Sequence, residues 1–90
     1  MAAKTPDSVV IENLGSNTLY KCRFSTSDID DADTYASTIK SAIAYWCNPT
    51  DVPTQTQEGI DVAYAQTTGI FTFYTGEDNR TGDLYILAKS

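Results

Sequence analysis

Four carboxylates within six residues form the densest group of chemically active side chains in the chain. They are Asp28, Asp30, Asp31 and Asp33, in the segment DIDDAD. Carboxylates spaced in this way bind Ca²⁺ in EF-hand loops. The EF-hand pattern fails here, because Ala32 stands where an oxygen ligand is required and Asp33 stands at the turn glycine. We interpret the cluster as a solvated acidic turn or the first turn of a helix, and expect no metal and no other cofactor.

The other residue types do not combine into a catalytic group. The chain has no histidine, so a nucleophile–histidine pair cannot form. Its five glycines stand singly at expected turns and make no phosphate-binding loop. No pattern places two carboxylates across a cleft, as glycoside hydrolysis requires. We therefore expect a protein that is not an enzyme.

The two cysteines, Cys22 and Cys47, both fall in apolar-patterned segments. Two cysteines without a histidine make a zinc site a poor interpretation. The N-terminus has one lysine and no apolar stretch of the kind found in secretory signals. We expect two buried, reduced thiols, with a disulfide as the alternative.

Ten aromatic residues are spread over the chain and present a choice between a stacking platform and a core. They are Tyr20, Phe24, Tyr35, Tyr45, Trp46, Tyr64, Phe71, Phe73, Tyr74 and Tyr85. Exposed aromatic rings would suit a carbohydrate- or receptor-binding module. Their alternation with other strand residues favours packing between strands instead. Both interpretations stay open, with core packing preferred.

Most of the chain shows strand patterning. Apolar and polar residues alternate over 59–65, and β-branched and aromatic residues fill 70–75 and 83–88, with glycine-containing connections between them. This predicts a three-stranded meander at the C-terminal end. Residues 8–13 and 18–25 flank a turn cluster and predict a hairpin. In the second of these strands we expect one set of side chains in the core, Tyr20, Cys22 and Phe24, and another on the outer face, Leu19, Lys21 and Arg23.

The segment 27–47 is ambiguous. Apolar residues at helical spacing would fit one helix at about 29–46, with Ser27 as its N-cap. Many residues in the segment are β-branched or aromatic and favour strands instead. Periodicity does not decide between an α+β fold with this helix and a central pair of strands within 33–47.

The overall composition excludes several partners. The chain has 90 residues and a net charge of −6, which suits one domain and disfavours nucleic acid or an anionic membrane. No apolar run approaches the roughly 20 residues of a membrane-spanning helix. Residues 1–8 are polar and are expected to form an N-terminal arm ahead of a single β-rich domain at 9–90. We expect a protein made in the cytoplasm.

Several predicted strands are apolar on both faces, which indicates a contact with other protein. A sheet with one face in water should alternate apolar and polar residues. Here both faces are apolar over 70–75 and 83–88, and Val9 and Ile11 on one face with Val10 on the other repeat the pattern near the N-terminus. A 90-residue chain has little else to cover them. We expect self-association or docking through this surface. The predicted contact residues are Trp46, Tyr74, Tyr85 and Leu87, together with the loop at 48–58.

Three segments resemble small β-rich structural proteins of tailed bacteriophages. They are VVIENLGSNTLYKCRF, DADTYASTIKSAIAYWC and the C-terminal stretch from Gly69 to Ala88. The resemblance implies strands in the central segment and a role in the virion, such as a capsid decoration (cement) protein or another head or tail accessory protein. It also implies self-association, as a trimer in many such proteins, and a major capsid or tail protein as partner. Ala32 departs from it, because such proteins often have glycine there.

Taken with this resemblance, the patterning predicts an all-β fold, a small antiparallel β-sandwich of six to seven short strands. The predicted function is structural, through docking on a phage particle. The alternatives are the carbohydrate- or receptor-binding module and the α+β fold.

Overall fold

The computed structural model describes residues 3–50, 60–76 and 78–89, with residues 26–28 described by their backbone alone. These residues form seven strands and no helix. The strands are β1 (Ser8–Asn13), β2 (Asn17–Ile29), β3 (Thr34–Ala36), β4 (Ala42–Pro49), β5 (Asp61–Ala65), β6 (Ile70–Tyr74) and β7 (Arg80–Lys89). The predicted all-β fold is confirmed, and the alternative helix at about 29–46 is wrong. No described element is a helix that could cross a membrane.

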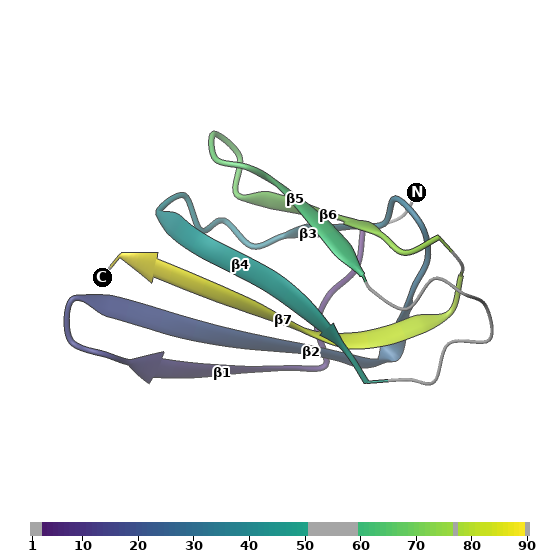
Figure 1. Cartoon of the computed structure of the whole chain (residues 1–90), viewed down its shortest axis with the longest axis horizontal. Coiled ribbons are helices and arrows are strands. Elements are labelled where there is room, and N and C mark those ends of the chain that lie inside the picture. The colour runs from purple at the N-terminus through teal and green to yellow at the C-terminus, as the bar shows by residue number, and fades with distance from the viewer. Residues whose placement is uncertain (1–2, 51–59, 77, 90) are drawn as a thin grey trace.

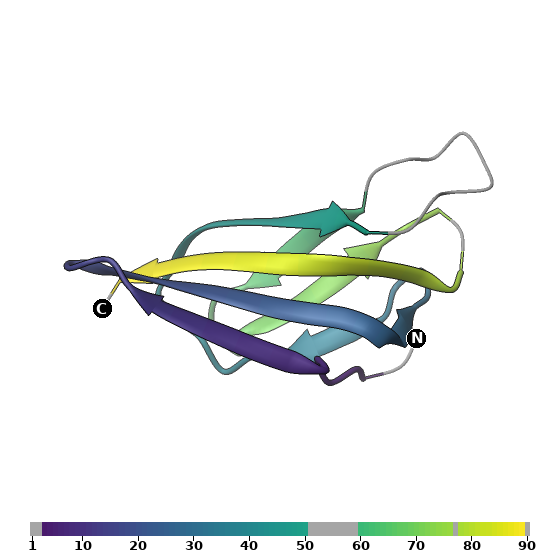
Figure 2. The same cartoon turned by 90° about the horizontal axis from the view of Figure 1, so that it is seen from below.

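The strands form two antiparallel sheets that pack face to face. One has four strands in the order β1-β2-β7-β4, and the other has three in the order β3-β6-β5. Figure 1 shows the two layers, and Figure 2 shows the three-stranded sheet behind the four-stranded one with its strands crossing at an angle. β7 lies inside the larger sheet between β2 and β4 and does not pair with β6. The predicted C-terminal meander is therefore wrong: β5 and β6 form a hairpin in the smaller sheet, and the third strand crosses to the larger one.

The core lies between the two sheets and follows from alternation along the strands. Cys22 and Phe24 of β2 point inward from one side, and Phe71 and Phe73 of β6 point inward from the other. The rings of Phe24 and Phe73 meet edge to face, with centroids 5.3 Å apart. The predicted inward set of β2 is thereby confirmed. The full buried cluster comprises Cys22, Phe24, Ile29, Ile60, Phe71, Phe73, Leu84 and Ile86.

The central segment forms two strands because left-handed backbone positions interrupt it. Ala32 has φ of +68° and Thr38 has φ of +64°. A right-handed helix cannot continue through either conformation. Between them Tyr35 of β3 turns its ring onto Phe24, at 5.6 Å. The segment thus crosses from one sheet to the other.

The first described residues lie along the free side of β3. Ala3 forms a parallel bridge with Thr34, and the backbone N–H of Lys4 donates to the Thr34 carbonyl over 2.7 Å. The Lys4 ammonium also lies 3.7 Å from the buried carboxylate of Asp33. This part of the predicted arm therefore adds to the three-stranded sheet.

Candidate functional site

The acidic cluster links two turns through hydrogen bonds. Asp33 accepts from the backbone N–H of Asp30 at 2.8 Å. Asp31 accepts from the N–H of Thr75 at 3.1 Å, and Asp30 accepts from the N–H of Asn79 at 2.9 Å. Asp33 is buried, so the interpretation as a fully solvated turn is wrong for that residue. Within the described residues no group of three or more ligand side chains is arranged to hold a metal.

The two cysteines lie on opposite sides of one residue of β7. Cys22 of β2 and Cys47 of β4 both pair with Leu84, so two strand spacings, roughly 9–10 Å, separate them. This is beyond the reach of a disulfide, and the thiols are not joined. The prediction of a buried thiol is confirmed for Cys22 and wrong for Cys47, which is only partly buried.

The aromatic residues divide between the core and the outside. Seven face the space between the sheets: Tyr20, Phe24, Tyr35, Tyr45, Tyr64, Phe71 and Phe73. The preferred interpretation, packing between strands, holds for these. The remaining three, Trp46, Tyr74 and Tyr85, lie on outer faces, because they alternate with inward-facing neighbours. Tyr45 packs against Phe71 yet keeps 37% of its surface exposed.

The outer face of the four-stranded sheet carries a row of side chains that crosses all four strands. Val10 of β1 pairs with Lys21 of β2, Lys21 pairs with Tyr85 of β7, and Tyr85 pairs with Trp46 of β4. Trp46 and Tyr85 stack with ring centroids 5.1 Å apart and planes 11° from parallel. On the other side of Tyr85 the Lys21 ammonium lies 5.9 Å from the ring centroid. Tyr85 is thus enclosed between an aromatic ring and a cation.

A second row, one step further along the strands, is mainly apolar. It consists of Glu12, Leu19, Leu87 and Ala44, which pair in that order. With the apolar members of the first row these side chains make a continuous apolar area. We call it the outer-face patch: Val10, Leu19, Ala44, Trp46, Tyr85 and Leu87. Trp46 keeps 48% of its surface exposed and Val10 keeps 52%.

The third row, at one end of the patch, contains charged residues. Asp83 of β7 has a side chain only 6% exposed, held between the Arg23 guanidinium at 3.4 Å and the Lys21 ammonium at 3.9 Å. The carboxylate of Asp7, which accepts hydrogen bonds from the N–H and hydroxyl of Ser25 two residues beyond Arg23, adds a second negative charge, so two cations and two carboxylates meet at this end of the patch.

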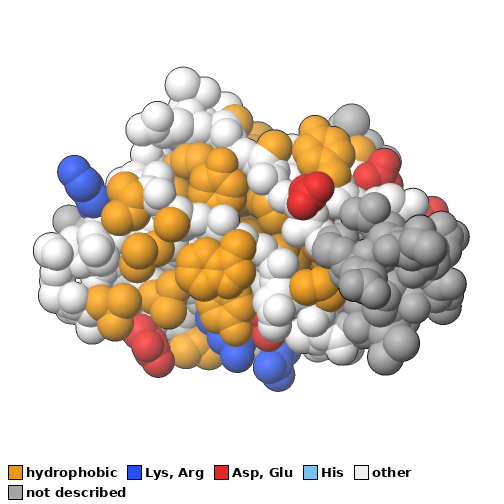
Figure 3. Space-filling view, viewed as in Figure 1, with side chains coloured by type: hydrophobic (Ala, Val, Ile, Leu, Met, Phe, Trp, Pro, Cys, Tyr) orange, Lys and Arg blue, Asp and Glu red, His pale blue; other side chains and the backbone are white. Residues whose placement is uncertain are grey.

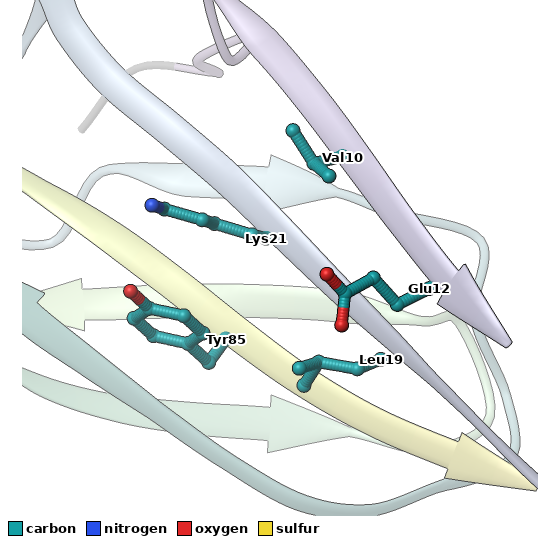
Figure 4. Close-up of a pocket in the computed structure, with 5 residues that line it drawn as sticks. All are labelled: Val10, Glu12, Leu19, Lys21 and Tyr85. Atoms are coloured by element: carbon teal, nitrogen blue, oxygen red, sulfur yellow. The ribbon is translucent and has the colours of Figure 1, made fainter. Parts of the chain in front are cut away.

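The patch contains a hollow of about 150 Å³ beside Tyr85. It is lined by Val10, Glu12, Leu19, Lys21 and Tyr85, which stand on one face of β1, β2 and β7 (Figure 4). The space-filling view shows hydrophobic side chains gathered over the surface along β4 (Figure 3). The charged groups at its walls are the Glu12 carboxylate and the Lys21 ammonium. A hollow of this size and lining can receive one side chain of a partner, and it brings together no catalytic group.

Three of the four predicted contact residues come together. Trp46, Tyr85 and Leu87 share the outer-face patch, whereas Tyr74 lies on the outer face of the other sheet. The predicted contact loop at 48–58 falls mostly on residues 51–59, outside the described residues. Sequence reasoning placed Leu19, Lys21 and Arg23 on an outer face correctly but did not connect them with Tyr85. That connection depends on pairing between strands more than 60 residues apart in sequence.

Comparison with protein-family models, with curated proteins and with solved structures found no match.

Proposed function

We propose that this protein is a non-enzymatic structural component of a larger protein assembly, which it joins through the outer-face patch. The observation that carries the proposal is the row from Val10 to Trp46, where apolar side chains remain exposed on a sheet face whose opposite side already packs the core. In an isolated domain, apolar residues on the solvent-facing side of a sheet add no buried surface. A partner that covers them supplies the missing burial.

The composition of the patch fits a protein partner. Trp46 and Tyr85 are of the types enriched at the centres of interfaces. The charged groups of Arg23, Asp83 and Glu12 lie at the margin, and Lys21 lies between Val10 and Tyr85 with its ammonium over the tyrosine ring. Tyr85 is already held between Trp46 and Lys21, so docking costs little side-chain entropy there. The patch therefore has an ordered centre and a polar rim.

The assembly we propose is the particle of a tailed bacteriophage, with a major capsid or tail protein as the surface that receives the domain. Support for this comes from the sequence resemblance described above. Many copies on a symmetrical particle would let modest individual contacts add up to stable attachment. Self-association would increase this effect further.

A carbohydrate-binding module is the second candidate, favoured by the exposed ring of Trp46. A sugar platform needs open aromatic faces. Both faces of Tyr85 are taken, one by Trp46 and one by Lys21, and the exposed ring of Tyr74 lies on the other sheet. Within the outer-face patch only Trp46 therefore offers an open face to a sugar. The arrangement therefore favours the protein partner.

The proposal is tested by mixing the purified chain with purified particles of the phage whose genome encodes it. We expect co-sedimentation that saturates at a fixed copy number per particle, and loss of binding on Trp46→Ser. The matched control is Tyr74→Ser on the other sheet, which should bind as the wild type does. A chain that stays in the supernatant, or that binds a glycan array instead, would refute the proposal.

A further inference from the structure

The free side of β1 is an open sheet edge. β1 pairs with β2 on one side, and on its other side no described strand is present. All six of its residues are exposed. An edge strand offers backbone donors and acceptors to any strand that can align with them.

The hairpin that joins β1 to β2 shows which backbone groups face the open side. The Leu14 N–H donates to the Asn17 carbonyl over 2.8 Å, which makes these two residues a hydrogen-bonded pair. Backbone groups of an antiparallel strand point alternately to its two sides. The even-numbered residues of β1 therefore bond to β2, and Val9 and Ile11 direct their N–H and C=O groups outward.

Of the other three edge strands, β3 and β4 carry features that hinder further pairing. The free side of β3 is occupied by the bridge to Ala3. β4 has an irregular register between Ala42 and Ala44 and ends at Pro49. On its free side Cys47 forms an isolated antiparallel bridge with Ile60, the residue before β5. Bulges, prolines and covering segments are the usual means of preventing edge-to-edge association. The centre of β1 has none of them, because its sequence there is Val-Val-Ile.

The side chains at this edge are apolar on both faces and poorly covered. Val9 and Ile11 point to the core side of the sheet, yet they keep 43% and 62% of their surface exposed. Val10 points to the outer face and keeps 52%. A strand added beside β1 would cover apolar surface on both faces at once.

We propose that this edge pairs with β1 of a second copy of the chain, antiparallel, around a two-fold axis at Val10. In this register Val10 lies opposite Val10 of the partner subunit, and Val9 lies opposite Ile11 of the partner subunit. Ser8 and Glu12 then flank the apolar centre. Moving the two-fold axis to Ile11 shifts the register by two residues and places Val10 opposite the carboxylate of Glu12 of the partner subunit. A register shifted by one residue would set side chains of opposite sheet faces against each other. Only the register centred on Val10 pairs each apolar residue with another.

The resulting dimer has one continuous eight-stranded sheet. Its two outer-face patches lie on the same side, at equal distances from the axis, and would act together on a repetitive surface. Pairing of two six-residue strands is a small contact, so the dimer should dissociate on dilution. The pairing uses the edge of the sheet opposite Trp46, and Val10 is the one residue of the outer-face patch that it involves. Docking through Trp46 and Tyr85 can therefore be tested separately.

Disulfide trapping tests the register. Residues opposite each other at a position without hydrogen bonds have Cα atoms about 4.5 Å apart, a separation that a disulfide spans. We expect Val10→Cys to form a covalent dimer under mild oxidation, well beyond the amount formed by the wild type with its native thiols. The matched control, Glu12→Cys, lies on the same face but opposite Ser8 of the partner subunit, and should not cross-link to its own copy. Equal trapping of both variants, or of neither, overturns the proposal.

Sedimentation equilibrium tests the dimer itself. We expect the wild type to show a concentration-dependent monomer–dimer equilibrium, and Ile11→Lys to raise the dissociation constant by at least about tenfold, because a lysine at the edge blocks pairing. Trp46→Ser, at the far edge of the same sheet, should dimerise as the wild type does. A wild type that stays monomeric or forms trimers, or an Ile11→Lys variant that dimerises normally, contradicts the proposal.

Discussion

Trp46 and Tyr85 lie opposite each other on adjacent strands, and their rings stack 5.1 Å apart on the outside of the sheet. On the inside of the same sheet Leu84 and Ile86, the neighbours of Tyr85, are buried in the core. One strand thus supplies both the core and the proposed docking surface. Substitutions on the inner face should therefore lower the stability of the domain, and substitutions on the outer face should mainly weaken its attachment to a partner.

The first prediction compares one aromatic residue from each side of the molecule. Phe73→Ala should lower the free energy of unfolding by about 3–5 kcal/mol, because it empties a fully buried site. Trp46→Ala should lower it by only about 2 kcal/mol, because the half-exposed ring gives up one stacking contact and part of a buried surface. Equilibrium unfolding in urea measures both. Similar losses for the two variants would show that Trp46 belongs to the core.

The second prediction concerns the turn before β3. Ala32 has φ of +68°, a left-handed conformation that costs an ordinary residue roughly 1–2 kcal/mol. Ala32→Gly removes this cost. Because glycine loses more conformational entropy on folding, the net gain in the free energy of unfolding should be about 0.5–1 kcal/mol. The control is Ala63→Gly in strand β5, which should destabilise. Destabilisation by both would mean that the turn does not need a left-handed residue.

The third prediction compares two glycines with positive φ. A Cβ on Gly69 would lie 2.8 Å from the backbone of Thr38, whereas a Cβ on Gly15 meets nothing within 4 Å. Gly15→Ala should therefore cost about 1–2 kcal/mol from conformation alone. Gly69→Ala should cost clearly more, because the backbone of the neighbouring segment must also move. Thermal unfolding of both variants measures the difference, and equal losses would contradict the close approach.

The fourth prediction is a loss of stability at alkaline pH. Burial raises the pKa of the Cys22 thiol from 9.0 to about 11, and the nearby Tyr35 hydroxyl lowers it by less. Between these pH values the folded chain keeps a proton that the unfolded chain releases, so stability is full below pH 9 and falls as the pH rises towards 11. Burial, with a smaller effect of Cys22, also raises the pKa of Tyr35 to about 12, which extends the fall.

The measurement for this prediction is urea unfolding at a series of pH values for the wild type and for Cys22→Ala. The variant should lose less stability than the wild type between pH 9 and pH 10, where the Cys22 thiol of the unfolded chain, with a pKa of 9.0, ionises ahead of Tyr35, whose ordinary pKa is 10.0. Parallel curves over this interval would show that Cys22 does not titrate with folding.

Local patterns in the sequence were enough to predict most of the fold. Residues 8–13 form β1 as predicted, and the alternation of Tyr20, Cys22 and Phe24 identified the inward face of β2. β2 and β7 both extend beyond the predicted ranges 18–25 and 83–88, because Ile29 pairs with Arg80 after an irregularity in the ladder. Such pairing depends on distant segments and leaves no local signal.

The candidate site was only partly predictable for the same reason. The apolar character of Trp46, Tyr85 and Leu87 on strands was visible, but their meeting on one face depends on the β4–β7 register. Tyr74 has the same local pattern, yet its strand belongs to the other sheet. The sequence shows apolar residues on both faces of β1, but the exposure of Val9 and Ile11 on the inner face was not predictable, since it depends on how far the smaller sheet extends.

Hydroxyl-radical footprinting of the chain, alone and bound to phage particles, tests the docking surface most directly. Oxidation is read by mass spectrometry for each residue of the chain, whatever the partner contains. We predict strong protection of Trp46, the only tryptophan in the sequence, and of Tyr85 on binding, with Tyr74 oxidised equally in both states. Equal oxidation of Trp46 in the two states, or protection of Tyr74 in its place, would contradict the assignment of the outer-face patch.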